Sequence, residues 1–356
     1  MNSKLDFTGL EFKKVHPVKA KQVIIAVCEK LGLPEQDRNI LADALVAADL
    51  RGVDTHGIRT MIVYAKRYQH KSLNPVPAIR VLRETPISAV IDGDNGLGHI
   101  VGYHAMKLAI QKARQTGIGM VAVRNSNHFG AAAFFTMMAQ KEDLIGVALT
   151  NASARLAPTG GITPTYGNNP WSVAFPVEEG QIPIVIDMAN SVVANSNIIM
   201  ARELGTKIPK DWALTKDGEP TDDPNLATLL LPIGGHKGYG IAFAVEYFSA
   251  ILSGSAYGKN VGLYDNLEKG QNVGHFFAVL DYKLFTENAN YHAKLGGFIS
   301  DIKSSKLAKG VESIYLPGEK EYLTALEREA NGIPIGLKYL EEINRLCQNL
   351  GLDIAL

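Results

Sequence analysis

A histidine, an arginine and a tyrosine lie close together early in the chain. His56 follows Thr55 in the segment 54–59, Arg59 ends that segment, and Tyr64 comes shortly after it. Histidine is the usual proton acceptor near neutral pH, and arginine binds a carboxylate through two parallel hydrogen bonds. These residue types suit the oxidation of an alcohol that also carries a carboxylate. A helix-capping turn with a solvated histidine is the plain alternative, and the residues alone leave it open.

A second histidine, His128, stands in the polar segment 124–130. The apolar residues 120–123 before it have the composition of a strand, and a helical pattern follows from about Gly130. Folds that alternate strands and helices place ligands at the carboxyl ends of their strands. His128 is therefore a second candidate for proton transfer, although a polar turn without chemistry explains the same residues equally well.

Three later segments have residue types that suit a nucleotide. Segment 234–240 places His236 and Lys237 among four glycines, just before an apolar stretch. Glycines let backbone amides approach a phosphate closely, and helix N-termini attract its charge. Segment 184–191 is an apolar strand that ends in an acid and small polar residues, and segment 167–171 is rich in asparagine. A plain strand end and a turn are the alternatives for these two.

One glycine motif matches a dinucleotide-binding loop only in part. Gly96, Gly98 and Gly102 follow a strand-like run at 87–91 and precede a helical pattern, which is the context of a dinucleotide-binding loop. The acidic residue expected about 20 positions later is missing, and no strand–helix–strand unit is evident there. A tight turn that caps a helix is the preferred interpretation, so we expect any nicotinamide nucleotide to bind without a Rossmann loop.

The overall composition excludes several other classes of protein. Of 356 residues, 46% are hydrophobic and 20% are charged, and 36 basic residues balance 36 acidic ones. This balance gives no general attraction to nucleic acid or to an anionic membrane. No stretch approaches the roughly 18–20 apolar residues that span a bilayer, and the N-terminus lacks the apolar core of a signal peptide. We therefore expect a cytoplasmic protein.

Metal and nucleophile chemistry have no support in the sequence. The nine histidines are dispersed and show none of the paired spacings typical of zinc sites, so we expect no metal. No G-x-S-x-G motif of a serine hydrolase occurs. The two cysteines, Cys28 and Cys347, are too few for a disulfide framework, and we expect both to be reduced and buried in helices.

The order of predicted elements indicates an α/β fold. Helical patterns cover 17–50 and the charged last sixth of the chain from Gly318, while short strands and helices alternate from about residue 87 to 149. Further strands are predicted at 172–175, 184–186 and 276–280. Residues 240–252 are almost wholly apolar, which predicts a buried helix.

Taken in order, these segments resemble the malate/L-lactate dehydrogenase family that is unrelated to the Rossmann-type enzymes. The resemblance runs from about Lys19 to Ile335 and rests on five motifs. The quoted residues are Thr55-His56-Gly57, Asn125-Ser126-Asn127-His128-Phe129-Gly130, Gly167-Asn168-Asn169-Pro170, the lysine-glycine turn 234–240 and Leu316-Pro317-Gly318-Glu319. Other members of this family are ureidoglycolate, sulfolactate and diketogulonate dehydrogenases.

The resemblance implies a distinctive non-Rossmann nucleotide-binding fold and a homodimer. Residues 1–75 and 300–356 would form one mainly helical domain from the packed chain ends. Residues 76–299 would form the central α/β region that binds cofactor and substrate. The cofactor, NAD with NADP possible, would contact residues Asp187, Met188, Ala189, Asn190, Ser191, His236, Lys237, Gly318, Glu319 and Lys320.

The resemblance also implies roles for the first two segments. His56 and His128 would be the catalytic acid/base residues, and either could accept the proton. We favour His128 as the acceptor, with His56 positioning the substrate or sharing the proton relay. Arg59, Tyr64 and Thr55 would bind the substrate. Many relatives have arginine where this chain has Thr60, and the usual cations after the cofactor strand are replaced at Ala194-Asn195-Ser196-Asn197. The second change, together with Glu319 as a partner for a ribose hydroxyl, favours NAD over NADP.

The implied reaction is hydride transfer between a nicotinamide and a small 2-hydroxy acid, with malate and oxaloacetate favoured. L-lactate, ureidoglycolate and diketo-sugar acids are the alternatives within the family. A non-catalytic NAD-binding sensor is a more remote alternative, because both histidines and Lys237 are intact.

Overall fold

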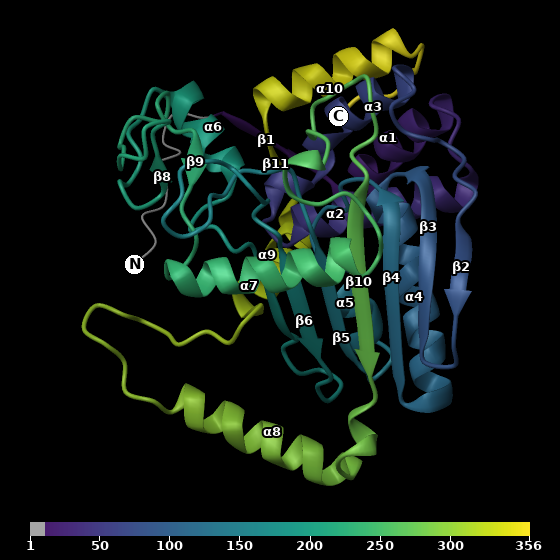
Figure 1. The fold of residues 1–356 in the computed structure, drawn as a ribbon, viewed down its shortest axis with the longest axis vertical. Helices are drawn as coiled ribbons and strands as arrows, with labels where there is room; N and C mark the ends of the chain where they lie inside the picture. The colour runs from purple at the N-terminus through teal and green to yellow at the C-terminus, as the bar shows by residue number, and fades with distance from the viewer. Residues whose placement is uncertain (1–10) are drawn as a thin grey trace.

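A mixed seven-stranded sheet forms the centre of the molecule in the computed structural model, which describes residues 11–356. Its strand order is β2-β3-β4-β10-β5-β6-β7 (Figure 1). Only β3 and β4 are parallel, and all other neighbours are antiparallel. The strands are β2 (Arg80–Glu84), β3 (Ser88–Gly96), β4 (Ile118–Ser126), β5 (Ile145–Thr150), β6 (Trp171–Phe175), β7 (Ile184–Met188) and β10 (Val273–Leu280).

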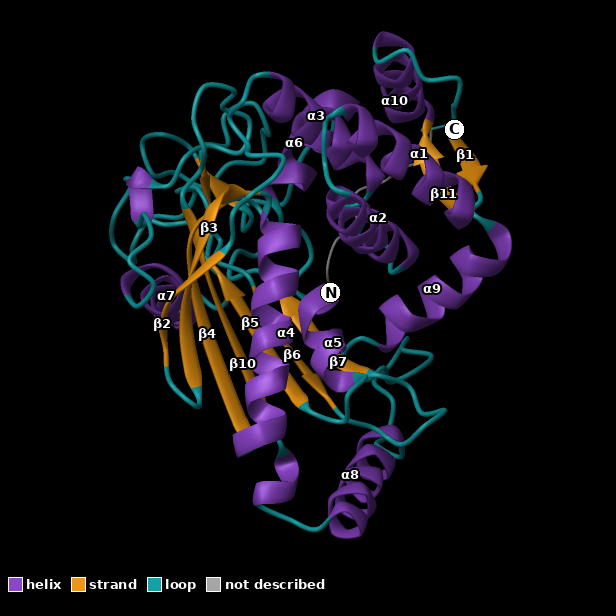
Figure 2. Cartoon of the chain, turned by 90° about the vertical axis from the view of Figure 1, so that its right-hand side faces the viewer, coloured by secondary structure: helices purple, strands orange, loops and turns teal. Residues whose placement is uncertain are grey.

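Helices cover both faces of this sheet (Figure 2). On one face lie α4 (Gly98–Thr116) and α5 (Ala133–Gln140), which pack on β4, β5 and β10. On the other face lies α7 (His236–Glu246), which continues into a π-helical turn, η3 (Tyr247–Ile251). Alternate residues of β5 and β10 are buried, as expected for strands that pack helices on their faces.

The glycine motif of Gly96, Gly98 and Gly102 does lie in a strand–helix–strand unit. β3, α4 and the parallel strand β4 make this unit, so the expectation that none begins there is wrong. The glycines serve close packing. A Cβ on Gly98 would lie 2.1 Å from the carbonyl oxygen of Asn127, and a Cβ on Gly102 would lie 2.8 Å from the Phe135 ring. The start of α4 is therefore pressed against the segment that carries His128, and Gly98 N–H donates to the His128 carbonyl.

The two ends of the chain pack together, as the sequence predicted. Strand β1 (Phe12–Val15) pairs antiparallel with β11 (Ile333–Gly336). Around this pair lie α1 (Pro17–Lys30), α2 (Glu35–Leu50), α3 (Met61–Gln69), α9 (Glu319–Asn331) and α10 (Leu337–Asn349). One apolar core joins α1, α2, α3 and α10 and contains Cys28 and Cys347, which are both buried and not bonded to each other. The α/β class with packed helical ends is thus confirmed.

A smaller lobe follows β7 in the sequence. It holds α6 (Asn195–Leu204) and the two-stranded sheet β8 (Ala213–Leu214) and β9 (Leu229–Leu230). Its own apolar cluster includes Leu156, Ile198 and Trp212. This lobe supplies the chain that leads into α7.

The apolar helix after residue 240 is not buried in the single chain, contrary to the prediction. Phe243 is 62% exposed, Tyr247 46% and Ile251 50%, while Ala242 and Val245 face the sheet and are buried. A helix that is apolar all round packs on every side, yet here only one side meets the sheet. The outer side of α7 and η3 therefore leaves a large apolar surface uncovered.

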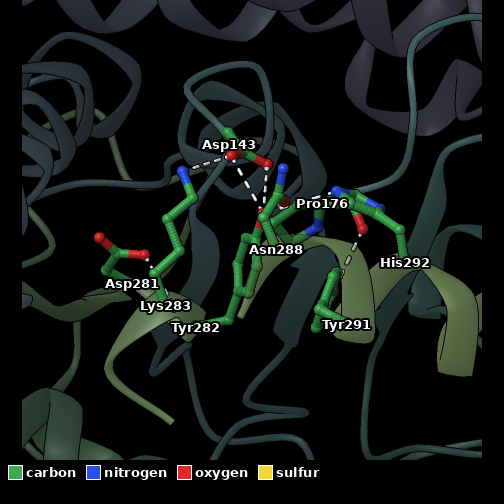
Figure 3. Close-up of polar contacts among 8 residues, drawn as sticks. All are labelled: Asp143, Pro176, Asp281, Tyr282, Lys283, Asn288, Tyr291 and His292. Atoms are coloured by element: carbon green, nitrogen blue, oxygen red, sulfur yellow. Dashed lines mark hydrogen bonds and ion pairs between the residues drawn. The ribbon is translucent and has the colours of Figure 1, made fainter. Parts of the chain in front are cut away.

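Helix α8 (Asn288–Lys303) projects from the body at the end of β10 and has no buried residue. A polar cluster anchors its start (Figure 3). The stacked rings of Tyr282 and Tyr291 have centroids 3.9 Å apart, Tyr291 donates to the Pro176 carbonyl at 3.2 Å, and Asp143 accepts from Tyr282 at 3.2 Å and from Lys283 at 2.6 Å. At the other end of α8, Lys303 pairs with Glu319, so both ends of this exposed helix contact the body of the molecule.

Within residues 11–356, no helix has both the length and the apolar character that a membrane crossing requires.

Candidate active site

The two predicted histidines meet at the boundary between the helical ends and the sheet. His56 ends the short helix η1 (Asp54–His56), and His128 follows β4. Their rings stack with centroids 5.4 Å apart and an interplanar angle of 26°. Both side chains are half-buried. Segments 54–59 and 124–130, far apart in the sequence, therefore form one site.

Each imidazole is held by a hydroxyl at its Nδ1 atom. Tyr64, fully buried on α3, lies with its hydroxyl oxygen 2.7 Å from Nδ1 of His128. The hydroxyl of Thr55 lies 2.8 Å from Nδ1 of His56. Nε2 of His128 has no hydrogen-bond partner in the described part of the chain. An imidazole fixed at one nitrogen and open at the other is suited to exchange a proton with a bound substrate.

The surroundings favour the neutral form of both histidines. Burial lowers the pKa of His128 well below its usual value, and the neighbouring His56, His99 and Arg67 lower it further. Burial and the charge of Arg59 likewise lower the pKa of His56. A neutral imidazole accepts a proton, so at neutral pH the site is ready to remove one from an alcohol.

The turn that presents His56 depends on a buried carboxyl group. Asp49, at the end of α2 and 3% exposed, accepts a hydrogen bond from Ile58 N–H at 2.7 Å. A Cβ on Gly57 would lie 1.7 Å from Oδ1 of Asp49, so only glycine fits next to His56. Burial raises the pKa of Asp49 to about 8, with the hydrogen bond from Ile58 opposing the shift. This packing explains the glycine of the Thr55-His56-Gly57 pattern.

Two further aromatic side chains complete the wall around His128. His99, 1% exposed at the start of α4, and Tyr264, on the loop before β10, have ring centroids 6.2 Å and 5.0 Å from that of His128. Sequence reasoning missed both. Tyr264 belongs to no motif, and His99 lies in the glycine turn that was considered only as a dinucleotide loop.

Arg59 does not join the histidine pair. Its guanidinium carbon lies 4.7 Å from the ring centroid of Tyr339 on α10. It lines a cavity of about 690 Å³ together with Asp49, Asp54 and Arg328, and neither histidine is among the described lining residues. Thr60, at the position of the arginine in many relatives, is buried and donates to the Gly57 carbonyl. Substrate binding by Arg59 therefore stays a prediction.

The three segments predicted to bind a nucleotide come together beside this site. Asn190, after β7, donates through its side chain to the Asn169 carbonyl, and its own carbonyl accepts from Ile233 N–H at 2.9 Å. Asp187 accepts from Ala133 N–H, the first residue of α5, at 2.9 Å. This hydrogen bond joins the end of β7 to the start of α5, the helix that follows the His128 segment in the chain. Met188, Ala189 and Ser191 occupy the same strand end.

The lysine-glycine turn has the form of a phosphate cradle. Gly234 and Gly235 have φ values of +58° and +61°, and a Cβ on Gly235 would meet no atom within 4 Å. α7 begins at His236 without a side-chain cap, and His236 and Lys237 are exposed. A cavity of about 470 Å³ adjoins this turn. The buried hydroxyl of Ser191 has no hydrogen-bond partner among the described residues, so a polar ligand fits this region.

Gly318, Glu319 and Lys320 lie against the outer strand β7. Val185 N–H donates to the Pro317 carbonyl at 3.0 Å. The Glu319 carboxylate is already engaged by Lys303 of α8 and by Leu316 N–H at 2.7 Å. Lys320 stands 4.8 Å from the Tyr315 ring centroid. A bond from Glu319 to a ribose hydroxyl would compete with these partners.

Comparison with known proteins identifies the class to which this fold and site belong. The model of the malate/L-lactate dehydrogenase family matches residues 15–344. The chain belongs to this family, and the resemblance inferred from the five motifs is confirmed.

Particular relatives cover nearly all of the chain. A malate dehydrogenase of Pyrococcus horikoshii is 43% identical over 340 residues, which are 93% of each chain. An L-sulfolactate dehydrogenase of Methanocaldococcus jannaschii is 39% identical and covers 95% of this chain and 97% of its own. The solved structure of Pyrococcus horikoshii malate dehydrogenase has a TM-score of 0.89 at 39% identity, with 98% of both chains covered.

The relatives also establish the kind of cofactor. A ureidoglycolate dehydrogenase of Escherichia coli, 31% identical over 85% of this chain and 87% of its own, is named for NAD⁺. A (2R)-3-sulfolactate dehydrogenase of Chromohalobacter salexigens, 31% identical over 87% and 91%, is named for NADP⁺. The chain is a nicotinamide-dependent dehydrogenase, as the sequence predicted.

Proposed function

We propose that the protein interconverts malate and oxaloacetate with NAD as its hydride carrier. The observation that carries this proposal is the histidine pair, in which Tyr64 holds Nδ1 of His128 and leaves Nε2 open. The malate dehydrogenase relatives, at 41–43% identity, support malate over the other 2-hydroxy acids. L-lactate and ureidoglycolate stay alternatives for the same site.

In this proposal His128 exchanges the proton, and its open Nε2 supports that role. In alcohol oxidation, its Nε2 accepts the C2 hydroxyl proton while the hydride leaves the same carbon; in reduction, the imidazolium returns the proton to the alkoxide oxygen. The nicotinamide ring, when bound, supplies C4 as the hydride acceptor. Tyr64 keeps the imidazole in one orientation, and His56, stacked on it, offers a second polar edge to the substrate.

The cofactor would lie along Asp187–Ser191, with its phosphates toward His236 and Lys237 and one end near Gly318–Lys320. The open glycine turn and the unpartnered Ser191 hydroxyl support this placement. Preference for NAD over NADP rests on the absence of cations in segment 194–197, at the start of α6. A 2′-phosphate would find no local positive charge in that segment.

Substrate binding is assigned to Thr55, Arg59 and Tyr64. Thr55 and Tyr64 each contact one of the two histidines. Arg59 makes no contact with the pair, but its positive charge lowers the pKa of His56. Rotation of the Arg59 side chain from Tyr339 would bring it to the substrate carboxylate. Arg59→Met should then raise KM for oxaloacetate with little change in kcat.

We also propose a homodimer built on the uncovered face of α7 and η3. Phe243, Tyr247 and Ile251 give this face the apolar character of a subunit interface. α8, which has no buried residue in the single chain, would extend along the second copy. Two domains, 1–75 with 300–356 and 76–299, remain the proposed division of each subunit; residues 1–10 lie outside the described residues. The cytoplasmic location stays a prediction.

The direct test is to mix the purified protein with oxaloacetate or pyruvate, each with NADH and separately with NADPH, and to follow loss of the reduced cofactor. Rapid loss with oxaloacetate and NADH supports the proposal. Loss with pyruvate alone moves the assignment to lactate, and loss with NADPH alone overturns the cofactor preference. Cofactor binding without turnover on any 2-oxo acid would favour a sensor.

A further inference from the structure

Arg67 is the one charged residue among the largest fully buried side chains of the described chain. It stands on α3 one turn beyond Tyr64 and has no exposed surface. Its guanidinium contacts only neutral acceptors: Gln271 Oε1 at 3.0 Å, Asn127 Oδ1 at 2.9 Å, Ser72 Oγ at 3.3 Å, Ser72 O at 3.4 Å and Lys269 O at 3.5 Å. No carboxylate of the described residues forms an ion pair with it.

The two amide acceptors lead directly to His128. Gln271 Oε1, which accepts from Arg67, also accepts from the backbone N–H of His128 at 3.0 Å. Asn127 Oδ1 accepts from Arg67 and from Gln271 N–H at 2.9 Å. The Asn127 amide nitrogen donates to Asn95 and Gly96. Arg67 therefore orients the side-chain amides of Gln271 and Asn127. The Gln271 amide holds the backbone N–H of His128, and the Asn127 amide holds the residue before it.

A buried cation without a counter-charge is costly, since burial removes its hydration. Arginine stays charged even when burial lowers its pKa, because its usual value is very high. Its positive charge acts on nearby groups through a medium of low dielectric constant. A neutral residue of the same volume would fill the space without this free-energy cost. The positive charge of Arg67 is therefore explained if it has a role in the active site.

We propose that Arg67 is a positioning residue of the dehydrogenase reaction, which holds the backbone of His128 through Gln271 and Asn127 and places a buried positive charge two hydrogen bonds from His128. This inference rests on the proposed function of His128 as proton acceptor. Arg67 itself touches no reacting atom in this account.

Other groups also act on the His128 imidazole and enter any pH dependence. They are His56 on η1, Tyr64 on α3, His99 on α4, Tyr264 on the loop before β10 and His275 on β10, with Arg59 on η2 (Ile58–Thr60) acting on His56. The neighbouring histidines are themselves held neutral by burial. Arg67 is therefore the permanently charged group among them, and it is linked to the His128 backbone through one shared acceptor, Gln271 Oε1.

The test compares pH profiles of kcat/KM for alcohol oxidation in three variants. Arg67→Met removes the charge, and its acidic limb should move up by about one pH unit, as expected for one charge at effective dielectric near 20. Gln271→Glu keeps the oxygen that accepts from Arg67 and from His128 but neutralises the cation, and it should shift the limb in the same direction. Arg67→Lys keeps the positive charge but loses the planar guanidinium that binds several acceptors at once. Its kcat should fall about tenfold, and the acidic limb of its pH profile should not move.

Lys112→Met is the matched control, because Lys112 is also a buried cation (5% exposed) but pairs with Glu84 at the far end of α4. It should change thermal stability and leave the profile in place. If the acidic limb of kcat/KM lies at the same pH in the wild type, Arg67→Met and Gln271→Glu, the proposal is wrong. If Arg67→Met does not fold, Gln271→Glu alone decides.

A readout without turnover separates this inference from the proposed function. The imidazole of His128 can be titrated by NMR in protein with ¹⁵N-labelled histidine and assigned by its absence in His128→Gln. Loss of the Arg67 charge should raise the His128 pKa even if no 2-hydroxy acid is a substrate. An unchanged titration in an active enzyme would contradict the role of Arg67 and leave the dehydrogenase assignment intact.

Discussion

At the residue scale, the Tyr64 hydroxyl decides how His128 works. If Nε2 faces the substrate as proton acceptor, Nδ1 must carry the hydrogen and donate it to Tyr64, 2.7 Å away. Tyr64 then selects the tautomer as well as the ring orientation. This role differs from the substrate contact predicted for Tyr64 from the family resemblance, and both can be tested on one variant.

Tyr64→Phe removes the hydroxyl and keeps the buried ring. We expect kcat to fall on the order of 10–100-fold because the imidazole loses its fixed tautomer. The KM for oxaloacetate should change little, whereas a substrate contact would raise KM at similar kcat. Steady-state kinetics separates the two outcomes, and Tyr68→Phe, on the same helix, is the control.

The low pKa of His128 predicts how activity depends on pH. The pKa lies well below its usual value of 6.5 in the protein, so the imidazole stays neutral as pH falls through 6.5. Oxidation of malate should therefore keep its kcat/KM through that pH and lose it only in more acidic solution. An acidic limb at or above 6.5 in the wild type would show that His128 is not held neutral, or is not the proton acceptor.

At the scale of elements, Asp49 couples α2 to the turn that carries His56. Its pKa is raised from 3.8 to about 8, so the folded protein binds more protons than the unfolded chain between these values. Stability contributed by this group is complete below pH 4 and is lost as pH rises toward 8. Ionisation of Asp49 would place an unpaired charge beside Gly57.

Asp49→Asn keeps the oxygen that accepts from Ile58 and cannot ionise. Its Tm, relative to wild type, should therefore rise by several degrees between pH 5 and pH 9. Asp43→Asn, an exposed acid on the same helix, should show a difference that hardly varies with pH. Thermal unfolding at both pH values gives the answer, and parallel curves for wild type and Asp49→Asn would show that Asp49 ionises freely.

The elements themselves were largely predictable, because apolar periodicity and glycines mark their limits. Both N-terminal helices, strands β3 to β7 and the charged final helices lie close to their predicted places. The surroundings of His128 were not predictable. His99, Tyr264 and Arg67 come from three separate elements, and only their separate tertiary contacts with Asn127 and His128 bring them together. Local sequence patterns do not encode such contacts.

At the scale of the whole molecule, the single chain leaves one apolar face open. The apolar sequence of α7 predicted a buried helix, and in the single chain this prediction is wrong, because the outer side of α7 and η3 is exposed. The exposed Phe243, Tyr247 and Ile251 lie over the sheet on the side opposite α4. A second copy that covers this face would complete the burial that the sequence predicted.

Phe243→Glu should weaken this proposed dimer, because a buried carboxylate without a partner is costly at an interface. Light scattering coupled to gel filtration should show a dimer for wild type and monomers for the variant. Val18→Glu changes a similarly exposed apolar residue at the start of α1 and should leave the dimer intact. A monomeric wild type, or a dimeric Phe243→Glu protein, would contradict the assignment of this face.

The most direct measurement of the central claim is turnover of oxaloacetate with NADH by the wild type and by His128→Gln. We expect rapid loss of the reduced cofactor in the wild type and a rate on the order of 10²–10⁴-fold lower in the variant. NADH binding, followed by fluorescence, should persist in both. Equal turnover in the two proteins would remove His128 from the chemistry and contradict the account.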